Sequence, residues 1–267
     1  MKFRLLFIIF NVVILVSFAL IFLMPAFVLG WEYTQVFWSS NWPVGAVFLL
    51  VLAGLNGYFV YNWRVFTLLE QEDWNGLIAY LEHEAYERTR LSRQRARILI
   101  NAYVVTGQVD RISDLEAFVR QEKASLLAKL AVEFGLPYLL SSDGEKMVEY
   151  FGELSREPRA SEPAWVRWCY AFGLMNGSRF DEARAELTAV LQESRDPLLR
   201  TLTAHMLEPF GAQDEATAQL VKDVRQELRA KLSRERFDRE LERQRQNLQV
   251  LFLSSRIEEA RDWVFRS

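Results

Sequence analysis

Two long apolar runs open the chain, and a periodic mixture of apolar and charged residues follows them. Residues 5–29 and 44–61 are almost wholly apolar. Helices of about 20 apolar residues are long enough to cross the roughly 30 Å hydrocarbon core of a bilayer. From residue 64 onward, apolar residues recur every three or four positions, as in helices that bury one face. The pattern predicts an all-α protein with a transmembrane helical hairpin over residues 1–63 and a helical domain beyond it.

The charges that flank the hairpin predict its orientation. Lys2 and Arg4 precede the first run and Arg64 follows the second, whereas residues 31–43 contain Glu32 but no lysine or arginine. Because basic flanks stay on the cytoplasmic side, both termini and the helical domain are expected in the cytoplasm. The alternative is a helical domain on the extracytoplasmic side. The aromatic residues of the segment 31–43 indicate a loop at the membrane interface: Trp31, Tyr33, Phe37, Trp38 and Trp42.

The two apolar runs give no sign of a cleaved leader or of a transport path. The first run exceeds the roughly 7–15 apolar residues of a signal peptide. Neither run contains Asp, Glu, Lys or Arg, which ion and proton paths normally need. Gly45, Gly54 and Gly57 in the second run favour close packing of the two helices. We therefore expect an anchor that contacts the lipid bilayer.

Turn residues recur along the helical domain at a nearly constant interval. Each of five positions follows an apolar helical stretch and precedes another, at intervals of 33 to 37 residues: Glu72, Gly107, Gly144, Gly177 and Gly211. A spacing near 34 is typical of helix–turn–helix repeats. An unspecified α-helical bundle is the alternative that periodicity alone leaves open.

The last full unit carries small and bulky residues at the positions that such repeats use: Ala204, Leu207, Gly211, Ala216 and Leu220. In this it resembles the tetratricopeptide-repeat (TPR) family, and the resemblance covers about residues 68–228 with a half-repeat near 248–264. Pro137 and Ile112 depart from the family pattern. The resemblance implies a TPR-like α-solenoid of antiparallel helix pairs over residues 64–228, with a groove that docks a protein partner.

An aromatic stripe provides the candidate partner-binding residues. Trp165, Trp168 and Phe172 recur at helical spacing, and His205 stands beside Ala204 in a first-helix position. If they line the groove, these side chains would anchor a peptide or a partner helix. The alternative is that neighbouring repeats bury them.

Two further segments are expected to form continuous helices. Residues 62–69 contain neither Gly nor Pro, so the second span is expected to continue through them into the first repeat. Residues 222–246 mix both charges and predict one long solvated helix, with contact to anionic lipid headgroups as the alternative. The domain boundaries expected are therefore 1–63, 64–228 and 229–267, the last holding the charged C-terminal helix and the half-repeat.

Candidate chemistry changes this picture little. The net charge of −3 gives no basic footprint for nucleic acid. The single cysteine, Cys169, excludes an internal disulfide and is expected to be a small buried apolar residue. His83 and Glu87 share a helix face, but a metal site needs further ligands. We expect no catalytic, cofactor or metal site and no small-molecule substrate. The sequence favours a docking scaffold, with an envelope-assembly repeat protein and an enzyme of dispersed site residues as the alternatives.

Overall fold

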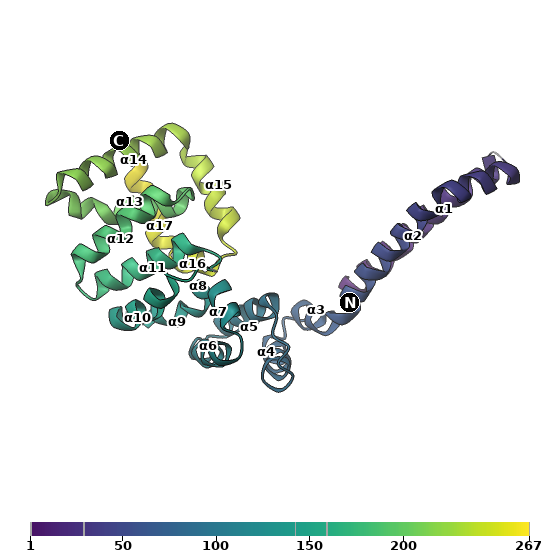
Figure 1. Ribbon diagram of the computed structural model, residues 1–267, viewed down its shortest axis with the longest axis horizontal. Helices are drawn as coiled ribbons and strands as arrows, with labels where there is room; N and C mark the ends of the chain where they lie inside the picture. The colour runs from purple at the N-terminus through teal and green to yellow at the C-terminus, as the bar shows by residue number, and fades with distance from the viewer. Residues whose placement is uncertain (1, 29, 142, 159, 267) are drawn as a thin grey trace. The chain divides into compact units, whose positions relative to one another are not determined.

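A computed structural model of the chain describes residues 2–28, 30–141, 143–158 and 160–266 (Figure 1). Those residues form helices and turns and contain no strand, which confirms the all-α prediction. Leu29, the last residue of the first predicted span, lies outside them. The chain divides into two compact units, residues 1–80 and residues 81–267, and the boundary falls within helix α4 (Trp74–Glu82).

The first unit contains an antiparallel pair of apolar helices, α1 (Lys2–Val28) and α2 (Trp31–Tyr61), both long and apolar enough to cross a membrane. The rings of Phe18 and Phe48 stack between them with centroids 4.2 Å apart. Asn56 Nδ2 donates to Asn11 Oδ1 across the pair at 2.8 Å. A polar pair of this kind fixes the register of two helices that otherwise meet through apolar side chains.

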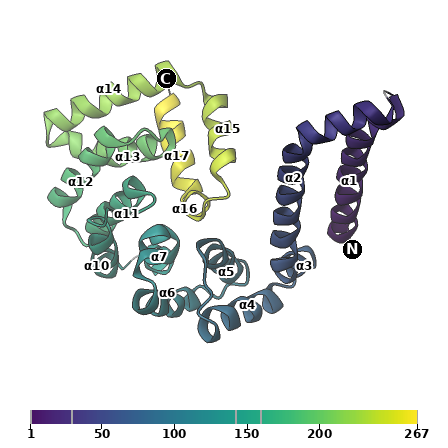
Figure 2. The same ribbon diagram turned by 45° about the vertical axis from the view of Figure 1, so that its right-hand side comes forward.

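The segment 31–43 is helical, so the loop predicted there is wrong. The turn between the spans is centred on Gly30 instead, whose φ of +86° suits glycine because a Cβ would be strained there. Pro43 lies inside α2 and cannot donate a helical hydrogen bond. Figure 2 shows that α2 changes direction along its length, as expected for a helix with an internal proline.

The predicted continuity of the second span into the first repeat is also interrupted. The helix α2 ends at Tyr61, and α3 (Trp63–Glu70) begins after one residue, Asn62, whose φ and ψ of −101° and 9° are not helical. Polar asparagine competes with the helical ladder, and here its side chain bonds back to the Tyr58 carbonyl at 3.0 Å. The interruption between α2 and α3 therefore occurs without a Gly or Pro residue.

Helix starts recur along the chain with a near-constant interval. The second helix of each successive pair begins at residue 74 (α4), 110 (α6), 144 (α10), 180 (α12) and 215 (α14), at intervals of 34 to 36 residues. Glu72, Gly107 and Ser178 all have positive φ in the turns that precede three of these starts. In each turn the backbone N–H of the residue that follows the positive-φ position donates to the carbonyl five residues earlier, and this hydrogen bond closes the preceding helix.

The helices of the second unit alternate between those that open a pair and those that close it. The opening helix of the third pair is divided into three short pieces by breaks at Leu130 and Gly135, and Pro137 lies in the first turn of the third piece. Opening helices are α5 (Arg93–Val105), α7 (Ala124–Lys129), α8 (Ala131–Phe134), α9 (Leu136–Ser141), α11 (Pro163–Asn176) and α13 (Pro197–Leu207). Closing helices are α6 (Asp110–Glu122), α10 (Gly144–Leu154), α12 (Phe180–Glu193) and α14 (Glu215–Lys231). A π-helical turn, η1 (His83–Glu87), follows α4, and a 3₁₀ turn, η2 (Glu208–Ala212), follows α13.

The long helix predicted over residues 222–246 is wrong, because the chain breaks there into two helices. The helix α14 ends at Lys231, Leu232 is extended, and α15 (Arg234–Gln244) begins after Ser233. The Ser233 hydroxyl accepts from the Arg236 backbone N–H at 3.3 Å and caps the new helix. Two more helices follow, α16 (Leu248–Phe252) and α17 (Ser254–Phe265), where a half-repeat was expected.

The C-terminal helix α17 lies among the other helices of the second unit rather than at their edge. In Figure 1 and Figure 2 it runs inside the arc formed by α11, α12, α14 and α15. It packs against α13, α14 and α15, while α16 packs against α8. Ile257, Ala260 and Val264 of α17 are fully buried. The C-terminal segment is therefore part of the core of this unit.

Candidate functional site

The aromatic stripe on α11 is buried rather than open. Trp168 is 0% exposed and Trp165 is 6% exposed, and the Trp168 and Phe172 rings stack at 5.3 Å. Helix α11 packs against α10 on one side and α12 on the other, so its apolar faces are covered on both sides. The structure thus contradicts the prediction that Trp165 and Trp168 line an open groove, and both indoles are core side chains.

The other two predicted contact residues lie beneath the C-terminal helix. The guanidinium of Arg256 on α17 stands 5.3 Å above the ring of Phe172. The ring of Trp263, two turns further along α17, lies 5.5 Å from that of His205 on α13. We call the surface formed by Phe172 and His205 the inner face. The chain's own helix α17 occupies it.

Two arginines of α14 hold the end of α17. Arg225 and Arg229 donate to the backbone carbonyls of Trp263, Val264 and Arg266. The Arg225 guanidinium also stands 4.7 Å above the Trp263 ring. The last carbonyls of a helix lack partners within the helix and attract cations. Burial, and then the neighbouring charge of Arg229, lower the pKa of Arg225.

A second attachment holds the start of the C-terminal segment. Gln249 on α16 is 2% exposed and donates to the Glu162 carboxylate at 2.8 Å. Burial, and then the negative charge of Glu133, raise the pKa of Glu162, while Arg97 opposes the rise. Arg97 also forms an ion pair with Glu133 at 2.6 Å. The segment is therefore attached to α8 and α11 by a half-buried polar cluster as well as by apolar packing.

Within the described part of the second unit, two buried indole N–H groups, one on α11 and one on α17, lack a hydrogen-bond partner. The indole N–H groups of Trp168 and Trp263 are buried and have no hydrogen-bond partner among the described residues. An unsatisfied buried donor costs about 1–3 kcal/mol. Trp263 belongs to α17 itself, so the contact between α17 and the inner face is less favourable than a fully satisfied core contact would be.

The residues considered for metal chemistry stay near the surface or are inert. His83 Nδ1 lies 2.9 Å from Glu87 Oε2 in the π-helical turn, and both side chains are exposed. Across residues 2–28, 30–141, 143–158 and 160–266 no three His, Cys, Asp or Glu side chains gather where they could hold a metal ion. Cys169 is fully buried, and burial raises the pKa of its thiol, so it is a poor nucleophile at neutral pH.

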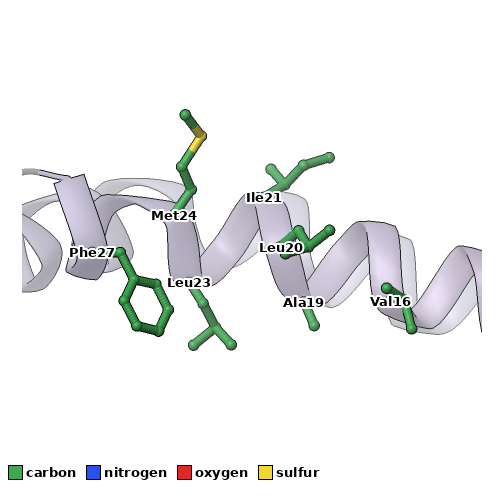
Figure 3. A pocket seen from close by; sticks show the side chains of 7 residues that line it. All are labelled: Val16, Ala19, Leu20, Ile21, Leu23, Met24 and Phe27. Atoms are coloured by element: carbon green, nitrogen blue, oxygen red, sulfur yellow. The ribbon is translucent and has the colours of Figure 1, made fainter.

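An apolar recess on α1 has the character of a lipid-facing surface. Figure 3 shows the side chains that surround it: Val16, Ala19, Leu20, Ile21, Leu23, Met24 and Phe27. Phe27 is 86% exposed, and no lining residue offers a charged or hydrogen-bonding side chain. Specific ligand sites combine apolar walls with a few polar groups that fix the ligand's orientation. This recess lacks such groups and suits acyl chains instead.

Sequence reasoning missed the residues that cover the inner face. Arg225, Arg229, Gln249 and Arg256 stand in stretches that read simply as charged or polar helix. The only available signal was the apolar spacing of Ile257, Ala260 and Val264, which shows that α17 buries a face. It does not show against which helix.

Comparison with known proteins gives a family match. A family described as "Uncharacterised Treponema protein" matches residues 111–266, more than half of the chain. An "Uncharacterized protein" of Treponema pallidum (strain Nichols) is 26% identical over 257 residues, which cover 92% of this chain and 80% of that protein. No solved structure matches the chain. The family match includes α11, α13 and the C-terminal helices, and the chain belongs to this Treponema protein family.

Proposed function

We propose that this protein is a membrane-anchored docking protein whose helix pairs form a TPR-like solenoid that binds a protein partner. The hairpin of α1 and α2 would hold the second unit at a membrane. Their large side chains face outward, as with Leu6 at 68% and Leu50 at 72% exposed. In water such surfaces would be costly, whereas acyl chains would cover them.

The repeat of helix starts supports the solenoid. Successive pairs begin their second helices 34 to 36 residues apart, and α10 packs on α11, α11 on α12, α12 on α13 and α13 on α14. In a solenoid each pair buries its apolar faces only against neighbouring pairs. The interval is that of the TPR family, whose members present one face of the array to peptides or partner domains.

The observation that carries the docking function is the occupied inner face. The C-terminal segment is held by Arg225, Arg229 and Gln249 and leaves the Trp263 indole N–H unsatisfied. In the proposed solenoid, the inner face that it covers is the face that would receive a partner helix. A partner helix that satisfies these groups would compete with α17 for Phe172 and His205. The C-terminal segment would then regulate access to the partner.

The second unit is proposed to face the cytoplasm. Arg64 follows the second apolar helix, Lys2 and Arg4 precede the first, and the turn side has Glu32 without basic residues. Alkaline phosphatase fused after residue 267 should be inactive and green fluorescent protein fused there should fluoresce. Active phosphatase with dark fluorescent protein would place the unit outside the cytoplasm.

The test of docking is capture from native membranes. The full chain, an Arg225→Ala/Arg229→Ala variant and a matched Arg90→Ala/Arg156→Ala control would be crosslinked and purified. The control changes two exposed arginines away from α17. We expect one discrete protein that is enriched by the α14 variant and not by the control. Absence of any discrete protein in all three samples would contradict the docking function.

A further inference from the structure

A cluster of basic side chains that outnumber the acidic ones lies between α13, α14 and α15. Two adjoining hollows of about 420 and 460 Å³ share Pro197, Lys231 and Leu232 in their walls. Six basic side chains line them: Arg195, Arg200, Lys231, Arg236, Arg239 and Arg243. Only two acidic side chains do so, Glu227 and Glu240. The lining therefore has a formal charge of +4, in a chain whose net charge is −3.

The acidic side chains are already engaged by part of this set. Glu227 pairs with Arg200 at 2.7 Å and with Lys231 at 2.6 Å, and these two partners lower its pKa to about 2. Glu240 pairs with Arg243 at 2.6 Å. Each carboxylate is therefore already paired with a cation of the set, so the charges of the other arginines are not offset by either one.

Three guanidinium groups at the hollows are left without an ion-pair partner. Within the described part of the chain, no carboxylate lies within 4.0 Å of the charged nitrogens of Arg195, Arg236 or Arg239. Glu235, one turn before Arg239, is hydrogen-bonded to Ser233, and its charge also interacts with that of Arg239, whose Nε donates to the Glu235 backbone carbonyl at 3.3 Å. Arg236 lies in the first turn of α15, where the helix end adds partial positive charge. Gathering like charges costs free energy that a bound anion would recover.

We propose that these hollows form a binding site for a phosphate group. A planar guanidinium can donate two parallel hydrogen bonds to two oxygens of a phosphate. A phosphate offers more oxygens than a carboxylate, so several guanidinium groups around one hollow favour a phosphate. Phosphates of this kind occur in anionic phospholipid headgroups and in free phosphate compounds. The site is distinct from the inner face and does not rest on the proposed docking function.

Binding of two phosphate probes to the full chain in non-ionic micelles tests the site. Calorimetry would follow inorganic pyrophosphate in one arm and dioctanoyl phosphatidylglycerol in the other, with dioctanoyl phosphatidylcholine as the neutral lipid. We expect saturable one-to-one binding that weakens about tenfold or more in Arg236→Gln/Arg239→Gln. The Arg90→Gln/Arg156→Gln control removes the same charge elsewhere and should bind like the unchanged chain. Exposed Arg236 and Arg239 support no core packing, so an unchanged melting curve is expected.

The two arms identify the source of the phosphate. Binding of phosphatidylglycerol but not pyrophosphate assigns a lipid headgroup, and the reverse assigns a free phosphate compound. Failure of both probes to bind, or equal weakening by the two double variants, would overturn the site. None of these measurements involves a protein partner, so their outcome does not decide whether the docking function is correct.

Discussion

Replacing Arg225 and Arg229 with alanine should loosen α17 while the helices beneath it stay folded. The two guanidinium groups donate to the carbonyls of Trp263, Val264 and Arg266. A hydrogen bond to a charged group contributes about 1.5–3 kcal/mol, and partial exposure places these near the lower limit. We therefore expect the free energy of local opening of α17 to fall by about 2–3 kcal/mol.

The remaining contacts decide how far the loosening goes. Ile257, Ala260 and Val264 stay fully buried, and burial of one large aliphatic side chain contributes about 1.5–3 kcal/mol. The helix α17 should therefore stay docked for most of the time and open more often. Amide hydrogen exchange over residues 254–265 would then accelerate about 30- to 150-fold, since each 1.4 kcal/mol is a factor of ten.

Hydrogen exchange read by mass spectrometry on the full chain in micelles provides the assay, with Arg90→Ala/Arg156→Ala as the control. Amides of α11 and α12 should exchange as in the unchanged chain. Unchanged exchange in α17 would refute the role given to the two arginines. Equal acceleration in every helix of the second unit would show global destabilisation instead.

Three more predictions test the core, the repeat turns and the polar cluster. Trp168→Ala should destabilise the second unit by about 3–5 kcal/mol, because the indole is fully buried. Phe180→Ala removes a side chain that is 52% exposed and should cost under about 1 kcal/mol. Similar denaturation midpoints for the two variants would contradict the burial of Trp168. Gly107 has a φ of +71°, so Gly107→Ala should lower the stability by about 1 kcal/mol. Ser178 has a φ of +59°, so Ser178→Gly should leave the stability unchanged or raise it. Thermal melting measures both changes in stability, and a loss in both variants would be inconsistent with these turns. Because the folded pKa of Glu162 is raised above its unfolded value of 4.5, the folded state binds more protons, and stability falls as pH rises from 4.5 through the folded pKa. Glu162→Gln should remove that fall in urea denaturation measured at pH 5 and pH 7.5, and an unchanged slope would contradict it.

Local signals predicted much of the fold. Apolar runs indicated the two long helices, and turn residues indicated the helix pairs, because both depend on neighbours in sequence. Two errors arose where a polar side chain acted on the backbone without Gly or Pro. Ser233 caps α15 and so divides the predicted long helix, and Asn62 interrupts the passage from α2 to α3. A third error lies over residues 31–43, where an aromatic loop was expected but α2 begins at Trp31 and continues through Pro43.

The candidate site was less predictable than the fold. The sequence located the stripe on α11 but not its burial, since one helix pattern fits both an open groove and a packed interior. The meeting of Phe172 with Arg256, and of His205 with Trp263, joins residues 84 and 58 positions apart. Such pairings depend on how α17 folds back among the other helices. A local sequence pattern does not predict this arrangement.

The central claim is that α17 occupies an inner face that a protein partner can take. Its most direct test places the photo-crosslinker benzoylphenylalanine at position 172, in the full chain and in the Arg225→Ala/Arg229→Ala variant, in native membranes. We predict a link to residues 254–266 of the same chain in the first case. In the variant, part of this link should be replaced by a link to one discrete protein. The claim would be contradicted if both proteins gave links to α17 alone while hydrogen exchange showed that α17 is loosened in the variant.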